Sequence, residues 1–168
     1  MKEHTQKSLF DFTKSSSATK TILWSGLIAG ILDAIAGVIV YFIFFKFSPF
    51  QVLQFIATGI HGPEAMNGGI PMIIAGTIYH FIIAYACAIV YFFLYPRLAI
   101  LRNKIAVMGL LFGLGIWLVM NLLVLPLSNI PKGPFDMNLA IIGIIWHMTL
   151  VGLPIAIITS KYFSNNRN

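Results

Sequence analysis

The chain has little charge, a single cysteine and none of the common catalytic motifs. Only 10% of its 168 residues are charged and 58% are hydrophobic, a composition unlike that of a soluble domain. Because Cys87 is the only cysteine, an internal disulfide is excluded. A phosphate-binding glycine loop, His-Glu-x-x-His, a nucleophile elbow and Cys-x-x-Cys are all missing. We therefore expect no enzyme of the soluble type, while an intramembrane enzyme built on Asp, His and Asn stays open.

What the chain does have is four long apolar stretches. They cover about residues 22–45, 72–95, 105–127 and 138–159. A helix that crosses a bilayer needs about 20 mostly apolar residues, and each stretch meets this length. The sequence therefore predicts an all-α, polytopic membrane protein, with four transmembrane helices forming a bundle over residues 21–162 and the lipid bilayer as its surroundings.

The distribution of basic residues predicts the orientation, because positive residues in short loops mark the cytoplasmic side. Two loops carry one lysine each, Lys46 and Lys132. The two tails and the loop between the second and third stretches carry nine basic residues: Lys2, Lys7, Lys14, Lys20, Arg97, Arg102, Lys104, Lys161 and Arg167. Both termini are therefore expected in the cytoplasm. The net charge of +6 lies at helix ends, so it indicates topology and no nucleic-acid partner.

The segments outside the apolar stretches are short. Residues 1–20 are rich in Ser, Thr and Lys without an apolar face, and we expect a flexible cytoplasmic tail there. Residues 163–168 are expected to form a second cytoplasmic tail.

A short helix is predicted in the first outer loop, over residues 49–58, where Ser48-Pro49 starts it and Gly59 ends it. The helix is too short to cross a bilayer. One face would carry the polar residues Gln51, Gln54, Thr58 and His61. Lying in the outer membrane interface is the favoured interpretation. The alternative is a re-entrant helix whose polar face, with Glu64 nearby, lines the mouth of a site.

Two short strings recur along the chain and indicate a repeated helix pair. Gly26–Ile31 resembles Gly109–Leu114, and Gly76-Thr77-Ile78-Tyr79-His80 resembles Gly143-Ile144-Ile145-Trp146-His147. Parallel repeats place equivalent residues at similar depths around an axis along the membrane normal. His80 and His147 are therefore expected in the outer half of the membrane, Asn121 at a comparable depth, and Asp33 lower, near the midplane.

Ionisable groups inside a membrane are costly and mark functional sites by default. We expect His80, His147 and Asn121 to form a polar binding site with Asp33 below it, and His61 and Glu64 at its outer mouth. Binding or transport of a small solute or of protons is the first hypothesis. Haem or metal ligation by the two histidines is the second, and the cofactor stays unknown. An accessory protein that uses these residues for packing alone is the third. We also expect the chain to form a homo-oligomer.

The chain resembles the YagU-like family of small bacterial inner-membrane proteins. The resemblance rests on Tyr79-His80-Phe81, Tyr95-Pro96-Arg97, the helix with Gly109 and Gly113, Val124-Leu125-Pro126-Leu127 and Trp146-His147. It covers the last three stretches best, and the outer loops differ. The resemblance implies a multi-pass protein of the bacterial inner membrane and implies no reaction or substrate.

Overall fold

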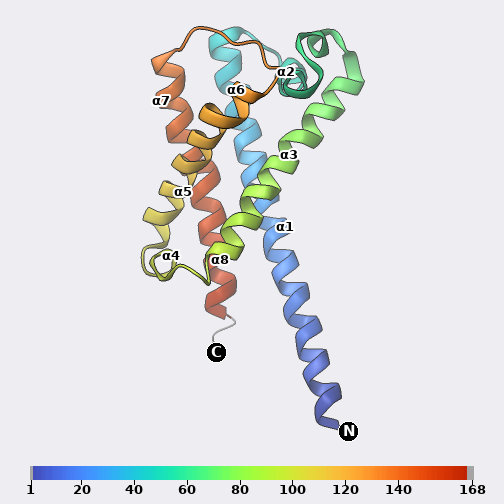
Figure 1. Cartoon of the computed structure of the whole chain (residues 1–168), viewed down its shortest axis with the longest axis vertical. Coiled ribbons are helices and arrows are strands. Elements are labelled where there is room, and N and C mark those ends of the chain that lie inside the picture. Colours follow the sequence, from blue (N-terminus) through green and yellow to red (C-terminus); the bar gives the residue numbers. More distant parts are fainter. Residues whose placement is uncertain (1, 166–168) are drawn as a thin grey trace.

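The computed structural model describes the backbone of residues 2–165 and the side chains of residues 18–165. Every regular element in this part of the chain is a helix or a helical turn (Figure 1). In order, these are α1 (Lys2–Phe45), α2 (Pro49–His61), η1 (Pro63–Asn67), α3 (Gly69–Leu94), α4 (Ala99–Asn103), α5 (Ile105–Val119), η2 (Met120–Val124), α6 (Leu125–Leu127), α7 (Met137–Trp146), η3 (His147–Gly152) and α8 (Leu153–Asn165). The all-helical class is therefore confirmed.

Four continuous helical segments are long and apolar enough to cross a membrane. They are Ala18–Phe45, Gly69–Leu94, Ile105–Leu127 and Met137–Asn165. Each predicted stretch coincides with one of them, which confirms a multi-pass membrane protein by length and composition. The first segment belongs to α1, which reaches back to Lys2 through the predicted tail. Flexibility of residues 1–20 stays a prediction, because the side chains before residue 18 lie outside the described residues.

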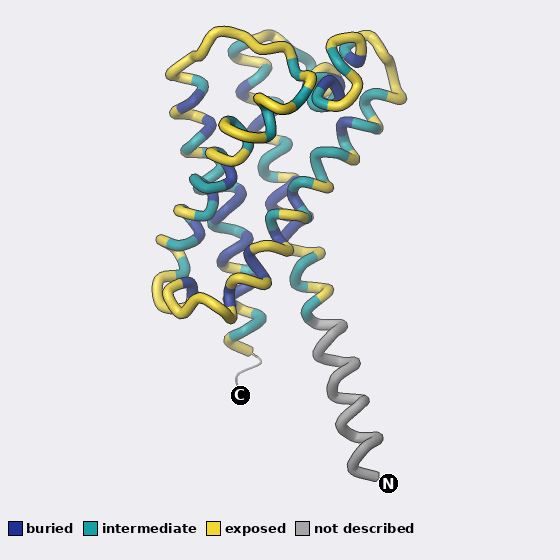
Figure 2. Tube along the Cα trace, in the orientation of Figure 1, coloured by how far each residue is buried: buried dark blue, intermediate teal, exposed yellow. Residues whose placement is uncertain are grey.

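Contacts between the helices bury a narrow strip and leave most apolar side chains facing outward. α1 packs against α3 and α8, while α5 packs against η3 and α8. Buried positions follow these contacts and exposed positions cover the outer faces and the loops (Figure 2). Only 11–28% of each apolar window is buried within the chain. The outward aliphatic and aromatic side chains therefore need lipid around them.

Gly30 and Gly113, which occupy matching positions in the repeated strings, each let another helix pack closely against their own. A β-carbon at Gly30 would meet the ring of Phe81 at 2.8 Å, and one at Gly113 would meet the Cα of Met148 at 2.5 Å. Phe81 and Met148 each follow the repeated histidine by one residue. The two pairs of helices thus meet in the same register, as the recurring strings indicated.

The third and fourth spans each contain a π-helical turn that ends just before a Leu-Pro pair. η2 precedes Leu125-Pro126 and η3 precedes Leu153-Pro154. Proline has no N–H and its ring clashes with the carbonyl four residues earlier, so the preceding turn must widen or bend. In the fourth span this disturbance is the π-helical turn η3, which begins at His147.

The helix in the first outer loop is longer than predicted. α2 ends at His61, and Gly62, with a φ of 79°, follows it; Gly59 stays helical, so the predicted end at residue 58 is wrong. The positive φ that ends the helix falls on Gly62, a conformation that glycine adopts without cost. The predicted start is confirmed, because Ser48 and Gln51 form a capping box.

Part of the predicted polar face of α2 lies against the protein. Gln54 and Thr58 are buried, whereas Gln51 and His61 are exposed. In the orientation that satisfies both of its polar atoms, the side-chain amide of Gln54 donates to the carbonyl of Met66 and accepts from the backbone N–H of Gly69. The apolar Val52 and Ala57 are buried as well, so α2 packs against the rest of the chain through polar and apolar side chains together.

A segment from the second half of the chain also holds α2. The backbone N–H of Asn129 donates to the carbonyl of Gly59 at 3.0 Å, and its side-chain amide donates to the carbonyl of Ile60 at 3.0 Å. These bonds satisfy carbonyls in the last turn of α2, which a helix end leaves without intrahelical partners. The loop before α7 is thereby bound to the first outer loop.

Replacing Gly76 with alanine is expected to separate α2 from α3. A β-carbon at Gly76 would overlap the backbone carbonyl of Leu53, which cannot rotate away. The expected loss is about 1–3 kcal/mol of unfolding free energy, typical of an overpacked contact. Thermal unfolding in mild detergent measures it. Gly37→Ala is the matched control, because nothing lies within 4 Å of a β-carbon there; equal stability of the two variants would contradict the close contact.

Candidate functional site

Asp33 lies between the two repeated histidines. Its Oδ2 is 3.9 Å from Nδ1 of His80 on α3, and its Oδ1 is 3.9 Å from Nε2 of His147 at the start of η3. The three residues come from three of the four spans, and together we call them the Asp33 site. The carboxylate and the two imidazoles predicted as binding residues are therefore gathered in one place.

The other nitrogen of each imidazole is bound to a backbone carbonyl. Nε2 of His80 lies 2.8 Å from the carbonyl of Gly30, and Nδ1 of His147 lies 2.6 Å from the carbonyl of Gly143. A carbonyl oxygen only accepts, so each of these nitrogens must carry a hydrogen. In the neutral form of each ring, which has a single N–H, the nitrogen that faces Asp33 is an acceptor; in the protonated form the same nitrogen is a donor.

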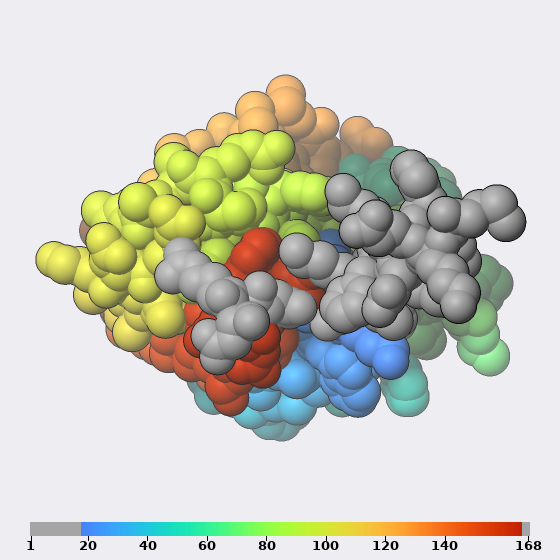
Figure 3. All heavy atoms as spheres, turned by 90° about the horizontal axis from the view of Figure 1, so that it is seen from below, coloured from blue at the N-terminus to red at the C-terminus, as the bar shows by residue number. Residues whose placement is uncertain are grey.

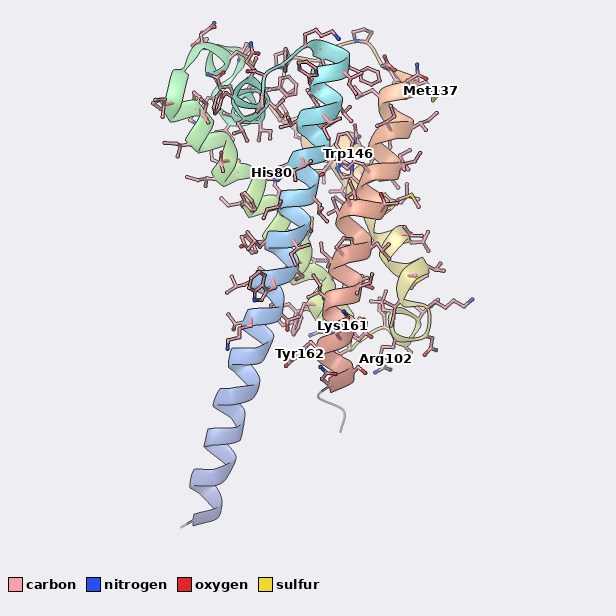
Figure 4. The ribbon with its side chains drawn as sticks, turned by 180° about the vertical axis from the view of Figure 1, so that it is seen from behind. His80, Arg102, Met137, Trp146, Lys161 and Tyr162 are labelled. Atoms are coloured by element: carbon pink, nitrogen blue, oxygen red, sulfur yellow. The ribbon has the colours of Figure 1, made fainter. Side chains whose placement is uncertain are left out.

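Among the residues whose side chains are described, Trp146 is the one that donates a hydrogen bond to the Asp33 carboxylate. Its indole Nε1 donates to Oδ1 of Asp33 at 2.7 Å. Figure 4 shows Trp146 and His80 at the same level of the molecule, on either side of α1. Trp146 was not among the predicted binding residues. A signal was present, because a tryptophan inside an apolar helix needs a partner for its N–H and this one adjoins His147.

The Asp33 site is largely enclosed. The side chains of His80, His147 and Asp33 are 11%, 13% and 24% exposed, respectively. A carboxylate in this setting has lost most of its water and gains one hydrogen bond from Trp146 in return.

The structure places Asp33 nearly level with the two histidines. α3 begins at Gly69, three residues before the predicted start at 72, so His80 is 11 residues from the outer end of its helix (80 − 69). His147 is 10 residues from Met137 (147 − 137), and Asp33 is 12 residues from Phe45 (45 − 33). At 1.5 Å per residue these positions agree within about 3 Å along the helix axes.

Asn121 is held within its own helix. It lies in η2, and its side-chain amide donates to the carbonyl of Trp117, one turn earlier, at 2.9 Å. No hydrogen bond in the described part of the chain joins Asn121 to the Asp33 site. Widening of the helix before Pro126 disturbs the backbone pairing in this region, and the asparagine amide caps one of its carbonyls.

His61 and Glu64 lie in the segment between α1 and α3, on two different elements, and neither belongs to the Asp33 site. His61 ends α2, and its Nε2 is 2.9 Å from the hydroxyl of Tyr79 on α3. Glu64 is an exposed residue of η1. Tyr79 precedes His80, so the outer pair and the Asp33 site are carried by neighbouring residues of α3.

The positions of the described side chains can be compared with what a metal ion would need as ligands. Among the residues whose side chains are described, no group of three or more His, Cys, Asp or Glu is placed to hold a metal ion. The 3.9 Å separations lie beyond direct hydrogen-bonding distance, so a hydrogen bond between either imidazole and Asp33 requires the side chains to move closer or a water molecule to bridge them.

Comparison of the chain with protein-family models, with curated proteins and with solved structures finds no match. The resemblance to the YagU-like family therefore stays a prediction, and the function has to be argued from the geometry of the site.

Proposed function

We propose that this chain is a proton-binding membrane protein that conducts protons, or a small solute linked to them, through the Asp33 site. The observation that carries the proposal is the convergence of two imidazoles on one carboxylate. Backbone carbonyls hold the other nitrogen of each ring, so in the neutral form two imidazole nitrogens and the carboxylate face one another as acceptors.

A proton resolves the repulsion between these acceptors. If Nδ1 of His80 or Nε2 of His147 takes up a proton, an imidazolium faces the carboxylate and a charge-assisted hydrogen bond replaces a 3.9 Å gap. Imidazole is the side chain whose charge changes near neutral pH, so the exchange is reversible under ordinary conditions. With two histidines on either side of one carboxylate, a proton can pass from the Asp33-facing nitrogen of one imidazole to that of the other by way of the carboxylate.

The proposal includes an arrangement in the membrane. The four apolar segments form a bundle in the bacterial inner membrane, with both termini in the cytoplasm. Arg102 and Lys161 lie near the end of the molecule opposite to Met137 (Figure 4), which supports a cytoplasmic position for that end by the positive-inside rule. α2 then lies at the outer side, as an interfacial or re-entrant helix. A non-enzymatic role and a homo-oligomer belong to the same proposal.

Replacing either histidine with alanine is expected to abolish proton flux. Each change removes one of the two acceptors beside Asp33 and should lower the flux by at least about 100-fold, the scale of a lost proton-transfer group. Proteoliposomes with a trapped pH-sensitive dye measure this after a potassium gradient and valinomycin impose a membrane potential. The variants to compare are His80→Ala, His147→Ala and Thr149→Ala, since Thr149 is exposed and bonds only within its own helix.

The same experiment separates the hypotheses. Loss of flux in both histidine variants, with flux retained in Thr149→Ala, supports proton conduction. A role in packing alone predicts lower thermal stability and no selective effect on flux. A wild-type protein that carries no protons at any pH would reject the proposed function.

A further inference from the structure

Three basic side chains at the end of the molecule opposite to α2 have no acidic partner among the described residues. Arg97, Arg102 and Lys161 are all exposed, and none of them takes part in an ion pair there. The carboxylates whose side chains are described lie elsewhere, in the Asp33 site, in η1 and at the start of α7. In the described part of the chain, this end therefore presents uncompensated positive charge.

A buried cluster brings these three cations to one surface. Tyr95 and Leu101 are 4% and 7% exposed and belong to one hydrophobic cluster, against which Phe163 packs. The rings of Tyr95 and Phe163 stack with their centroids 5.0 Å apart. Each cation lies within two residues of one of these anchors along the chain: Arg97 near Tyr95, Arg102 next to Leu101 and Lys161 near Phe163.

The pictures agree with this placement. In the view from below (Figure 3), the α4 region in yellow adjoins the end of α8 in red, and the two also lie together at one end of the molecule in Figure 1. Figure 4 shows Arg102 and Lys161 at that same end. We call Arg97, Arg102 and Lys161 together the basic rim.

Arg97 is held in place by the end of α3. Its Nη1 donates to the carbonyl of Phe93 at 2.5 Å. This carbonyl belongs to the last turn of the helix, where carbonyls have no intrahelical partner. A guanidinium has five N–H groups, so one of them orients the side chain and the others stay available for an anion.

The basic rim lies at the depth of lipid headgroups. Lys161 follows Met137, at the start of the fourth span, by 24 residues (161 − 137), which is about 36 Å along the helix axes. The hydrocarbon core of a bilayer is about 30 Å thick. A span that starts at one surface therefore carries Lys161 past the acyl chains on the other side.

Apolar side chains border the basic rim. Leu98 and Ile100 lie between Arg97 and Arg102 in the chain and are 44% and 54% exposed. Exposed aliphatic side chains beside cations suit the boundary between headgroups and hydrocarbon. An anionic phospholipid satisfies both kinds of group, with its phosphate on the cations and its acyl chains on the aliphatic side chains. A nucleic acid or an acidic protein would satisfy the cations alone.

We propose that the basic rim binds the headgroup of an anionic phospholipid from the leaflet on its own side of the membrane. The two guanidinium groups donate paired hydrogen bonds to phosphate oxygens, and Lys161 adds a third positive charge. The three side chains come from the turn after α3, from α4 and from α8, so one bound lipid ties three elements together. This binding does not depend on proton conduction through the Asp33 site.

A titration of the protein in a neutral detergent tests the basic rim. Phosphatidylglycerol is expected to raise the temperature of unfolding, because a ligand that binds the folded state stabilises it. Phosphatidylcholine, inorganic phosphate and polyglutamate are expected to raise it much less. Arg97→Gln, Arg102→Gln and Lys161→Gln should each weaken the apparent affinity for phosphatidylglycerol about fivefold. An equal effect of phosphate or polyglutamate would identify a site for soluble anions and overturn the proposal.

Lys20→Gln and Lys132→Gln are the matched controls, because each also removes one positive charge. Lys132 is exposed in the loop before α7, at the opposite end of the molecule. Lys20 is exposed on α1, and α1 lies on the other side of α8 from α4 (Figure 3). Both variants are expected to bind phosphatidylglycerol as the wild type does. If they weaken the affinity as much as Arg102→Gln, the attraction is spread over the whole surface and the basic rim is refuted as a site.

Native mass spectrometry gives a readout that does not depend on stability. From an equimolar mixture of phosphatidylglycerol and phosphatidylcholine, the wild type is expected to retain phosphatidylglycerol preferentially. The triple variant Arg97→Gln, Arg102→Gln, Lys161→Gln should lose this preference. Equal retention of both lipids by the wild type, or an unchanged preference in the triple variant, would overturn the proposal.

Discussion

Asp33→Asn abolishes proton flux and leaves the protein at least as stable as the wild type. This is the largest effect that the structure leads us to expect on activity. The asparagine oxygen can still accept from Trp146, which donates to Oδ1 of Asp33 at 2.7 Å. Its amide nitrogen can donate to one of the unprotonated imidazole nitrogens, as a bound proton would. The site is then fixed in a neutral, satisfied state, and the flux should fall by at least about 100-fold.

The expected stability of this variant carries as much information as its flux. A carboxylate inside a membrane is costly unless paired, so its replacement by a neutral isostere removes a destabilising charge. Thermal unfolding in detergent and dye-based flux measurements on the same preparation check both halves of the prediction. Asp136→Asn is the matched control, because Asp136 caps α7 at the outer end and asparagine caps equally well. Normal pH-dependent flux in Asp33→Asn would contradict the role of the carboxylate.

Gly113→Leu is expected to have the largest effect on the fold. A β-carbon at Gly113 would overlap the carbonyl of His147 and approach the Cα of Met148 at 2.5 Å. Both are backbone atoms, so the helices must move apart, and the cost exceeds the about 1–3 kcal/mol of an ordinary overpacked site. The displaced segment begins at His147, so the spacing between this imidazole and Asp33 should be lost with it.

Gly115→Leu provides the comparison for this variant. It lies two residues further along α5, and nothing is found within 4 Å of a β-carbon there. The same substitution on the same helix should therefore leave both thermal stability and flux close to the wild type. If the two leucine variants unfold at the same temperature, the close contact between α5 and η3 is refuted.

The helical class and the spans could be predicted because the membrane constrains them so strongly. A backbone in hydrocarbon has to satisfy its own hydrogen bonds, and about 20 apolar residues suffice to identify a span. The ends of the helices were harder to predict from the sequence. α2 ends before Gly62, which has a positive φ, and not at Gly59, which comes earlier in the chain. The sequence alone does not reveal which of the two glycines takes that conformation.

The candidate site was predictable in its members and not in its geometry. His80 and His147 stood out because a glycine precedes each by four residues, and the structure gives each a carbonyl partner, Gly30 for one and Gly143 for the other. The level of Asp33 depends on where three helices begin, and the contact with Trp146 depends on how α7 is rotated. A sequence pattern fixes neither quantity.

The bonds from Asn129 to the last turn of α2 have a mechanical consequence. They fasten the second half of the chain to the first at the outer surface, through carbonyls of Gly59 and Ile60. Any displacement of the segment around Asn129 relative to α2 therefore has to stretch or break these two hydrogen bonds.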